Sequence, residues 1–233
     1  MTNHTALLES LLEIYSPTGQ EAAAVEWLVG QMRAVGFAAS VDGAWNAVWV
    51  IGDAGGDVIL LGHIDTVPGF IPVRREGDRL YGRGAVDAKG PLAAFVAAAA
   101  RVGPLAGRRF VVIGAVGEEG DSRGAHFVKE RYRPAACIIG EPSGWDRITL
   151  AYKGSAWFEV EVSRTLAHTA AQPESACEAA VAYWNAVTAW ADARNSGKEK
   201  MFEQVNPTLR EMSSDSDGFT DRVRLRIGVR LPP

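Results

Sequence analysis

The sequence predicts an α/β protein, with a mostly parallel sheet covered by helices on both faces and a partial α+β domain after it. Short apolar runs, such as residues 58–62 and 110–116, alternate with longer alanine-rich or amphipathic stretches such as residues 89–102. Short β-rich runs bounded by glycine are typical of buried strands, and the longer stretches are typical of helices. Such alternation favours parallel strands with helices packed on the sheet.

The predicted elements of the first 150 residues are apolar runs separated by turn residues. Leucines over 7–12 predict a first helix, and the Ser-Pro-Thr-Gly turn at 16–19 ends it. A second helix over 21–35 ends at Gly36, because glycine readily adopts the left-handed conformation after a helix. The other elements expected are, in chain order, strands at 37–42, 46–51 and 58–62, a hairpin over 70–81, a helix from Lys89, a strand at 110–116, a helix at 123–133 and a strand at 137–140.

The pattern changes after Gly144, and residues 151–233 are expected to form a second, partial domain. A strand at 157–162 precedes a long helix at 174–194, and two further strands follow at 207–213 and 221–231. This β-α-β-β order matches most of a split βαβ sandwich without its last helix and strand. We therefore predict two domains, 1–150 and 151–233.

Composition excludes several functional classes. The 233 residues carry a net charge of −4, whereas a general nucleic-acid surface is usually basic. No apolar run reaches the roughly 20 residues of a membrane span, and no secretory signal is apparent at the N-terminus. Cys137 and Cys177 do not form a close pair, and we expect both to be reduced core residues of a cytoplasmic protein.

Side chains that can bind metals stand where predicted apolar elements begin or end. His63 ends one apolar run, Glu118 and Glu119 follow another, Glu141 follows a third, and Asp87 precedes the alanine-rich helix. In an open α/β sheet, ligands bind at the carboxyl ends of the strands. Several carboxylates in one cleft repel one another unless a cation neutralises them. The sequence therefore predicts a metal site, with two ions as the economical interpretation.

Spacing suggests different tasks within this set. His63 and Asp65 lie on one face of a strand, so that Asp65 can orient the ring of a metal-bound His63. The adjacent side chains of Glu118 and Glu119 diverge, so one can bind a metal while the other acts on water. Metal-assisted hydrolysis requires this combination of a Lewis acid, an activated water and a general base.

Simpler interpretations exist for each residue taken alone. A single His at a strand end is more often structural, adjacent glutamates are usually solvated, and an Asp before a helix usually caps it. The glycine-rich turn at 82–90 is not a phosphate loop, because no Gly-Lys-Ser/Thr follows it. The metal-site hypothesis depends on the conjunction of these segments.

Four motifs in order resemble the zinc aminoacylase/carboxypeptidase family, which includes acetylornithine deacetylase and succinyl-diaminopimelate desuccinylase. They are Gly-His-Ile-Asp-Thr-Val-Pro at 62–68, Gly-Arg-Gly at 82–84 with Asp-Ala-Lys-Gly at 87–90, Gly-Glu-Glu-Gly at 117–120, and Gly-Glu-Pro at 140–142. Residues 85–91, 140–145 and 152–154 look most like the branch of lysine biosynthesis that deacylates N2-acylated lysine or ornithine.

The resemblance implies two Zn²⁺ ions per complete subunit, with Co²⁺ as a substitute. His63 and Glu141 would bind one ion, Glu119 the other, and Asp87 would bridge them. It also implies a cis peptide bond between Asp87 and Ala88.

Three further residues receive roles from the same resemblance. Asp65 would orient His63, and Glu118 would be the general base. Residues 151–233 would be a lid that forms a homodimer, with His168 reaching across the dimer to polarise the scissile carbonyl. His168 considered alone is more often an ordinary surface or core histidine.

The resemblance thus implies a hydrolase that removes an acyl group, or a small carrier protein, from N2-acylated lysine or ornithine. A related dipeptidase or desuccinylase is an alternative, as is an inactive binding or dimerisation module. Family members return from the lid to supply a final His ligand, whereas this chain ends inside the lid, and His4 and His126 fit no ligand motif. We therefore expect either a fragment or a natural truncation, which alone binds metal weakly and has little hydrolase activity.

Overall fold

The computed structural model describes residues 4–34, 36–52, 55–144, 146–166 and 174–233. The chain divides into two compact units, Met1–Trp145 and Asp146–Pro233. Each unit is described by itself. No helix within the described ranges is long and apolar enough to cross a membrane.

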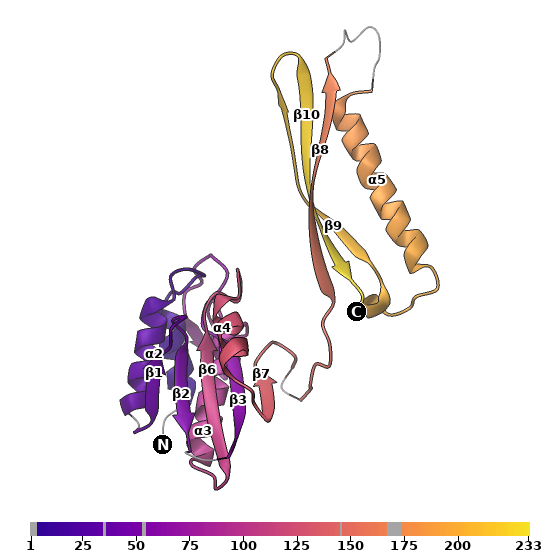
Figure 1. Cartoon of the computed structure of the whole chain (residues 1–233). Coiled ribbons are helices and arrows are strands. Elements are labelled where there is room, and N and C mark those ends of the chain that lie inside the picture. Colours follow the sequence, from indigo (N-terminus) through magenta and orange to yellow (C-terminus); the bar gives the residue numbers. More distant parts are fainter. Residues whose placement is uncertain (1–3, 35, 53–54, 145, 167–173) are drawn as a thin grey trace. The chain divides into compact units, whose positions relative to one another are not determined.

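The first unit contains a five-stranded sheet in the order β1-β2-β6-β3-β7 (Figure 1). Its strands are β1 (Ala38–Val41), β2 (Ala47–Ile51), β6 (Arg108–Ala115), β3 (Gly56–His63) and β7 (Ala136–Ile139). Strand β3 pairs in parallel with both β6 and β7, whereas β2 is antiparallel to both β1 and β6. The sheet is therefore mixed, and the expectation of a mostly parallel sheet needs correction.

The antiparallel pairing follows from the turn that joins β1 and β2. The Asp42 carboxylate accepts hydrogen bonds from the backbone N–H groups of Ala44 and Asn46, at 2.9 and 3.0 Å. Such a short connection can only reverse the chain, because parallel strands need a crossover of a dozen or more residues. The expected strands at 37–42 and 46–51 are already too close together for a βαβ crossover, whereas the antiparallel pairing of β2 with β6 has no such local signal.

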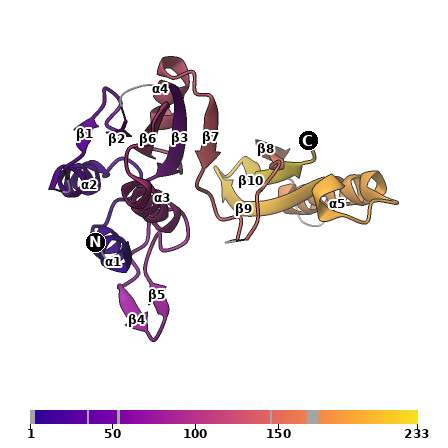
Figure 2. The same cartoon turned by 90° about the horizontal axis from the view of Figure 1, so that it is seen from below.

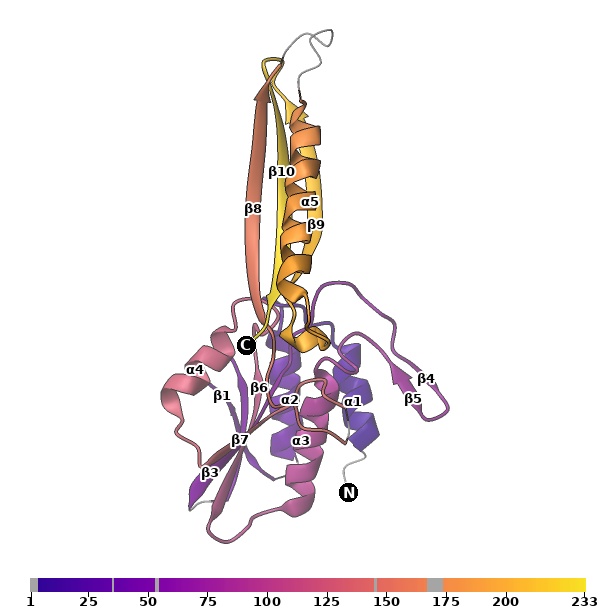
Figure 3. The same cartoon turned by 90° about the vertical axis from the view of Figure 1, so that its right-hand side faces the viewer.

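Helices cover both faces of the sheet, as the sequence predicts (Figure 3). Helices α1 (His4–Glu13), α2 (Ala22–Ala34) and α3 (Lys89–Val102) contribute to one core cluster, which also includes Trp49 and Val112. Helix α4 (Arg123–Arg131) covers the other face through Val128, which packs with Ile59 and Ile113. Two hydrophobic layers thus hold the sheet from opposite sides.

Buried Asn46 connects the end of strand β6 to helix α4. Its Oδ1 accepts a hydrogen bond from the Val116 backbone N–H at 3.0 Å, and its Nδ2 donates to the Gly124 carbonyl at 3.1 Å. A buried amide with these partners satisfies backbone groups that would otherwise be costly to bury. The turn between Val116 and Gly124, which carries Glu118 and Glu119, is therefore held at both ends.

A small hairpin, β4 (Arg74–Glu76) paired with β5 (Arg79–Tyr81), lies apart from the main sheet (Figure 2). It falls inside the hairpin region expected at 70–81, of which residues 70–73 are loop. In the second unit, β8 (Gly154–Thr165), β10 (Thr220–Leu231) and β9 (Asn206–Ser216) form an antiparallel sheet in the order β8-β10-β9.

Helix α5 (Ala176–Asn195) covers one face of this second sheet, and η2 (Met201–Glu203) is a short 3-10 helix before β9. Val223, Leu225 and Ile227 are buried under α5, while the arginines that alternate with them lie on the other face. Ser175 and Glu178 cap the start of α5 reciprocally, each accepting from the other's backbone N–H. The predicted β-α-β-β order of this unit is confirmed.

The expectation of two core cysteines is wrong. Cys137 and Cys177 are both free thiols and both exposed. Cys137 lies in β7, which is the edge strand of its sheet and pairs only with β3 among the described residues. Ile138 and Ile139 point to opposite faces and are both exposed, so neither face of β7 is fully covered. The apolar sequence of β7 therefore does not indicate full burial.

Candidate metal centre

Three neighbouring parallel strands bring the expected residues to one edge of the first sheet. His63 is the last residue of β3 and pairs in register with Ala115 of β6, three residues before Glu118. On the other side of β3, Leu61 pairs with Ile139 of β7, two residues before Glu141. Because the strands run in the same direction, the side chains that follow them meet at the carboxyl edge.

Carboxylates surround the buried imidazole of His63. Its Nε2 lies 3.1 Å from Asp87 Oδ1, 3.7 Å from Glu118 Oε2 and 3.9 Å from Glu141 Oε1. Asp87 comes from the turn before α3 and is largely exposed, as is Glu118, whereas Glu141 is mostly covered. The structure thus brings together residues separated by up to 78 positions in the chain (141 − 63).

Two groups of these side chains could each hold a metal ion. One consists of His63, Asp87 and Glu141, and the other of His63, Glu118 and Glu119; within each group the ligand atoms lie within 4.8 Å of one another. The first group matches the set that the resemblance assigns to one ion. The second differs from the expected set, because Glu118 rather than Asp87 accompanies Glu119.

Asp65 is fully buried beneath this cluster and does more than orient one ring. Its carboxylate accepts hydrogen bonds from the backbone N–H groups of Glu118 and Glu119, both at 3.1 Å, and from Thr18 Oγ1 at 2.8 Å. His63 Nδ1 lies 2.9 Å from the Asp65 carbonyl oxygen and 3.4 Å from its carboxylate. Asp65 therefore positions both the imidazole and the turn that carries the two glutamates.

Sequence reasoning missed Thr18. The Ser-Pro-Thr-Gly turn served only as a helix stop, yet Thr18 also donates its backbone N–H to the Thr66 carbonyl at 3.2 Å, which places it beside Asp65. The hydrogen bond from Thr18 to Asp65 joins positions 47 residues apart. Local sequence carries no signal for a pairing at that distance.

Three of the four histidines lie away from the cluster or have side chains outside the described residues. His126 is exposed on α4, on the face of the sheet covered by that helix. His168 lies in 167–173, outside the described residues, as does the side chain of His4. The expected role of His168 therefore remains a prediction. The expected cis peptide bond between Asp87 and Ala88 is present.

The pKa values of His63, Glu119 and Glu141 are all raised in this cluster. Burial by itself lowers the pKa of His63, but the hydrogen bond with Asp65 and the negative charges of Glu118, Asp65 and Glu141 outweigh it and raise the pKa to about 9. Burial raises the pKa of Glu119 and of Glu141, and the neighbouring carboxylates raise both further. Such mutual repulsion is the condition that a bound cation relieves.

We expect metal binding at His63 to release a proton near neutral pH. The metal-free imidazole carries a proton below its pKa of about 9, and a metal ion binds only the neutral ring. The apparent metal affinity should therefore rise about tenfold per pH unit between pH 6 and pH 8 and level off above the pKa.

Isothermal titration of Co²⁺ in buffers with different ionisation enthalpies would count the protons released. About one or more protons per ion at pH 7 is the expected result. Binding at pH 7 without proton release would show that His63 is neutral or is not a ligand.

A hollow of about 730 Å³ adjoins the cluster and is lined in part by Asp87 and Glu119. Its walls are partly apolar, from Val67 and Ile71, and Arg79 and Arg83 also line it. Arg83 Nε donates to the Gly69 carbonyl at 2.8 Å and so secures the loop on one side. Space for a bound molecule therefore lies directly beside the candidate metal ligands.

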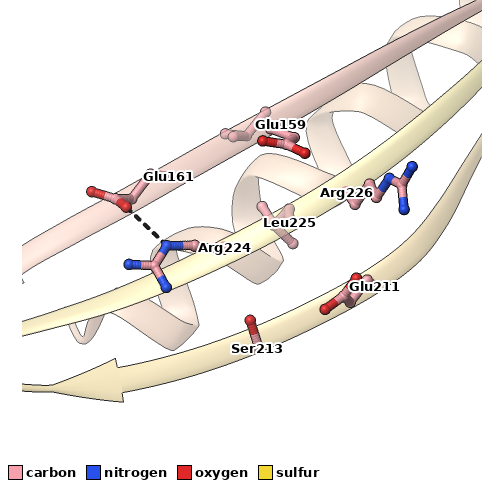
Figure 4. A pocket seen from close by; sticks show the side chains of 8 residues that line it. Glu159, Glu161, Glu211, Ser213, Arg224, Leu225 and Arg226 are labelled. Atoms are coloured by element: carbon pink, nitrogen blue, oxygen red, sulfur yellow. Dashed lines mark hydrogen bonds and ion pairs between the residues drawn. The ribbon is translucent and has the colours of Figure 1, made fainter.

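A second hollow, of about 400 Å³, lies on the exposed face of the sheet in the second unit (Figure 4). Its lining residues are Glu159, Val160, Glu161, Glu211, Ser213, Arg224, Leu225 and Arg226. Arg224 pairs with Glu161 at 3.2 Å and with Asp215 at 3.1 Å. Such exposed ion pairs contribute little and do not by themselves indicate a site.

Comparison with known proteins places this arrangement in a family. A model of Peptidase family M20/M25/M40 matches residues 59–218. A [LysW]-lysine hydrolase of Deinococcus radiodurans is 44% identical over 234 residues, covering 97% of this chain and 65% of that protein. A putative [LysW]-lysine/[LysW]-ornithine hydrolase of Thermococcus kodakarensis is 37% identical over 226 residues, covering 97% and 62%. The chain thus spans less than two-thirds of the length of these relatives.

Solved structures show the same fold at low identity. Human carnosine dipeptidase 1 superposes with a TM-score of 0.68 at 17% identity, over 99% of this chain and 69% of that one. The M20 family metallo-carboxypeptidase Sso-CP2 of Sulfolobus solfataricus gives 0.67 at 13% identity, over 100% and 72%. With the family model matching more than half of its length, the chain belongs to Peptidase family M20/M25/M40.

Proposed function

We propose that the protein is a metal-dependent amidohydrolase that releases lysine or ornithine from an N2-acylated form. In this form a carrier protein supplies the acyl group that is bonded to the amine. The observation that carries this proposal is the convergence of Asp87, Glu118 and Glu141 on the buried His63, within 3.1–3.9 Å. Similarity to [LysW]-lysine hydrolase supports the substrate, because that relative is 44% identical over nearly the whole of this chain.

The residues present suit a metal such as Zn²⁺, with Co²⁺ as a substitute. One imidazole and several carboxylates offer the nitrogen and oxygen donors that these ions accept. We propose His63 and Glu141 for one ion, Glu119 for a second, and Asp87 between them. The raised pKa values of Glu119 and Glu141 support this assignment, because a nearby cation would offset the repulsion that causes them.

When bound, the ions supply Lewis-acid chemistry that favours attack of water on the amide carbonyl. Glu118 accepts a proton from the attacking water as the new C–O bond forms. It then gives this proton to the leaving amine as the C–N bond breaks. Two features suit Glu118 to this role: its carboxylate is accessible, and Asp65 holds its backbone N–H.

Several finer points belong to the same proposal. The hollow beside Asp87 and Glu119 is large for an acetyl group, which favours a larger acyl partner. We propose that residues 151–233 act as a dimer-forming lid to which His168 contributes, on the basis of the motif resemblance. A cytoplasmic location fits the two free thiols and the biosynthetic substrate.

A substrate panel tests the proposal. A metal-loaded version of the protein as long as its relatives would be assayed against carrier-linked lysine, N2-acetyl-lysine, an N-succinylated amine and a dipeptide, with a chelator-treated sample as control. We expect cleavage of the lysine conjugates and its loss with the chelator. Preference for the dipeptide or the succinyl amine would favour the related peptidase or desuccinylase, and binding without cleavage of any substrate would favour a non-catalytic module.

A further inference from the structure

Lys89 is a buried charged side chain next to the proposed metal centre. It is the first residue of helix α3, and only 1% of it is exposed. Its Nζ donates hydrogen bonds to the carbonyl oxygens of Leu11 and Ile14, at 3.0 and 2.7 Å. Helix α1 ends at Glu13, so these carbonyls belong to the C-terminal end of a helix, where a cation is favoured.

The turn that carries Asp87 is closed against the aliphatic stem of Lys89. A Cβ atom built on Gly84 would lie 3.2 and 3.3 Å from Cδ and Cγ of Lys89, and 2.9 Å from Cγ2 of Thr66. The Gly84 carbonyl in turn accepts a hydrogen bond from the Gly90 N–H at 3.3 Å. The turn therefore leaves no room for a side chain at Gly84. The position of the turn depends on the Lys89 stem that it contacts.

Asp87 depends on this turn for its own position. Its side chain is 56% exposed, and within the described ranges its only hydrogen bond or ion pair is the one to His63 Nε2. The carboxylate therefore takes its place from the backbone before α3. A shift of that backbone would move the carboxylate relative to His63 and Glu141.

We propose that Lys89 is a positioning residue of the metal centre: anchored on the end of helix α1, it holds the turn that aims the Asp87 carboxylate. The inference rests on the proposed metal-binding function and adds a residue that touches neither metal nor substrate. An apolar side chain of similar length would fill the same space without the cost of burying an ammonium group. It would lack the hydrogen bonds to the carbonyl oxygens of Leu11 and Ile14.

The test compares Lys89→Met with a matched core variant, Val96→Ala. Val96 lies in the same helix, is almost fully buried in the core of the first unit, and is not among the atoms nearest to Gly84. For both variants and the unmodified chain, the Tm and the Zn²⁺ dissociation constant would be measured, the latter at 25 °C against a competing chelator.

We expect both variants to lower Tm and only Lys89→Met to raise the Zn²⁺ dissociation constant, by about 10–100-fold, as is usual for residues that support metal ligands. An unchanged constant in Lys89→Met, or an equal rise in Val96→Ala, would overturn the inference. If Lys89→Met does not fold, Lys89→Gln, whose shorter side chain reaches less far toward Leu11 and Ile14, takes its place, and its Zn²⁺ constant decides by the same criterion. No Zn²⁺ binding by the unmodified chain would overturn the metal centre itself.

Discussion

In a version of the protein as long as its M20 relatives, Glu118→Gln is expected to lower kcat by about 10³-fold while the metal content stays unchanged. The substitution keeps the shape of the side chain but removes its ability to accept a proton, and general-base catalysis typically contributes a factor of this order. Its backbone N–H still donates to Asp65, so the turn should keep its position. Turnover of carrier-linked lysine and metal analysis of the same sample give both quantities.

Glu119→Gln is the matched control, because it changes the neighbouring residue of the same turn. It should lose metal affinity together with activity, since Glu119 is the proposed ligand. If Glu118→Gln loses its metal and Glu119→Gln keeps it, the two roles are exchanged. Such an exchange is structurally feasible, because the ligand atoms of Glu118, His63 and Glu119 lie within 4.8 Å of one another.

Asp65→Asn is expected to reduce stability by about 2–4 kcal/mol, because a buried charged acceptor with several donors is lost. The carboxylate is 0% exposed and accepts from Thr18 and from the backbone of Glu118 and Glu119. The amide group would direct N–H atoms toward at least one of these donors. The pKa of His63 should fall, and Zn²⁺ affinity should decrease about 10–100-fold.

Asp57→Asn is the comparison for this prediction. Asp57 lies near the start of the same strand β3, at the opposite end from His63, and pairs with Arg109 at 2.6 and 2.7 Å. Its loss should lower the denaturation midpoint and leave Zn²⁺ affinity unchanged. Equal effects of the two substitutions on Zn²⁺ affinity would mean that Asp65 supports only the fold.

The strand ends and the composition of the candidate site were readable from sequence, since both depend on local patterns. An apolar run that stops at a His or Glu marks the end of a buried strand, and β3, β6 and β7 all end within about two residues of their expected positions. The antiparallel pairing of β2 with β6 was not readable, because an apolar strand looks alike in either direction.

Other features depend on contacts between distant segments or on neighbours in the sheet. Thr18 reaches Asp65 only after residues 16–18 pair beside Thr66. Cys137 is exposed because β7 is an edge strand, although its sequence is as apolar as that of a central one. Hydrophobicity predicts that a segment is a strand but not how many neighbours the strand has.

The order of the ligands along the parallel strands also bears on when the centre can form. His63 is synthesised 78 residues before Glu141 (141 − 63), and β3 pairs with β6 and β7 only after α3 and α4 have been made. Such long-range parallel pairing is slow compared with helix formation, because the loop must close before its contacts stabilise it. A nascent chain shorter than 141 residues therefore holds an imidazole and several carboxylates without a complete ligand set. Metal binding should therefore begin only when the first unit has folded completely. In a pulse-labelling experiment, added metal should increase the protease resistance of the nascent chain only after β7 has been synthesised.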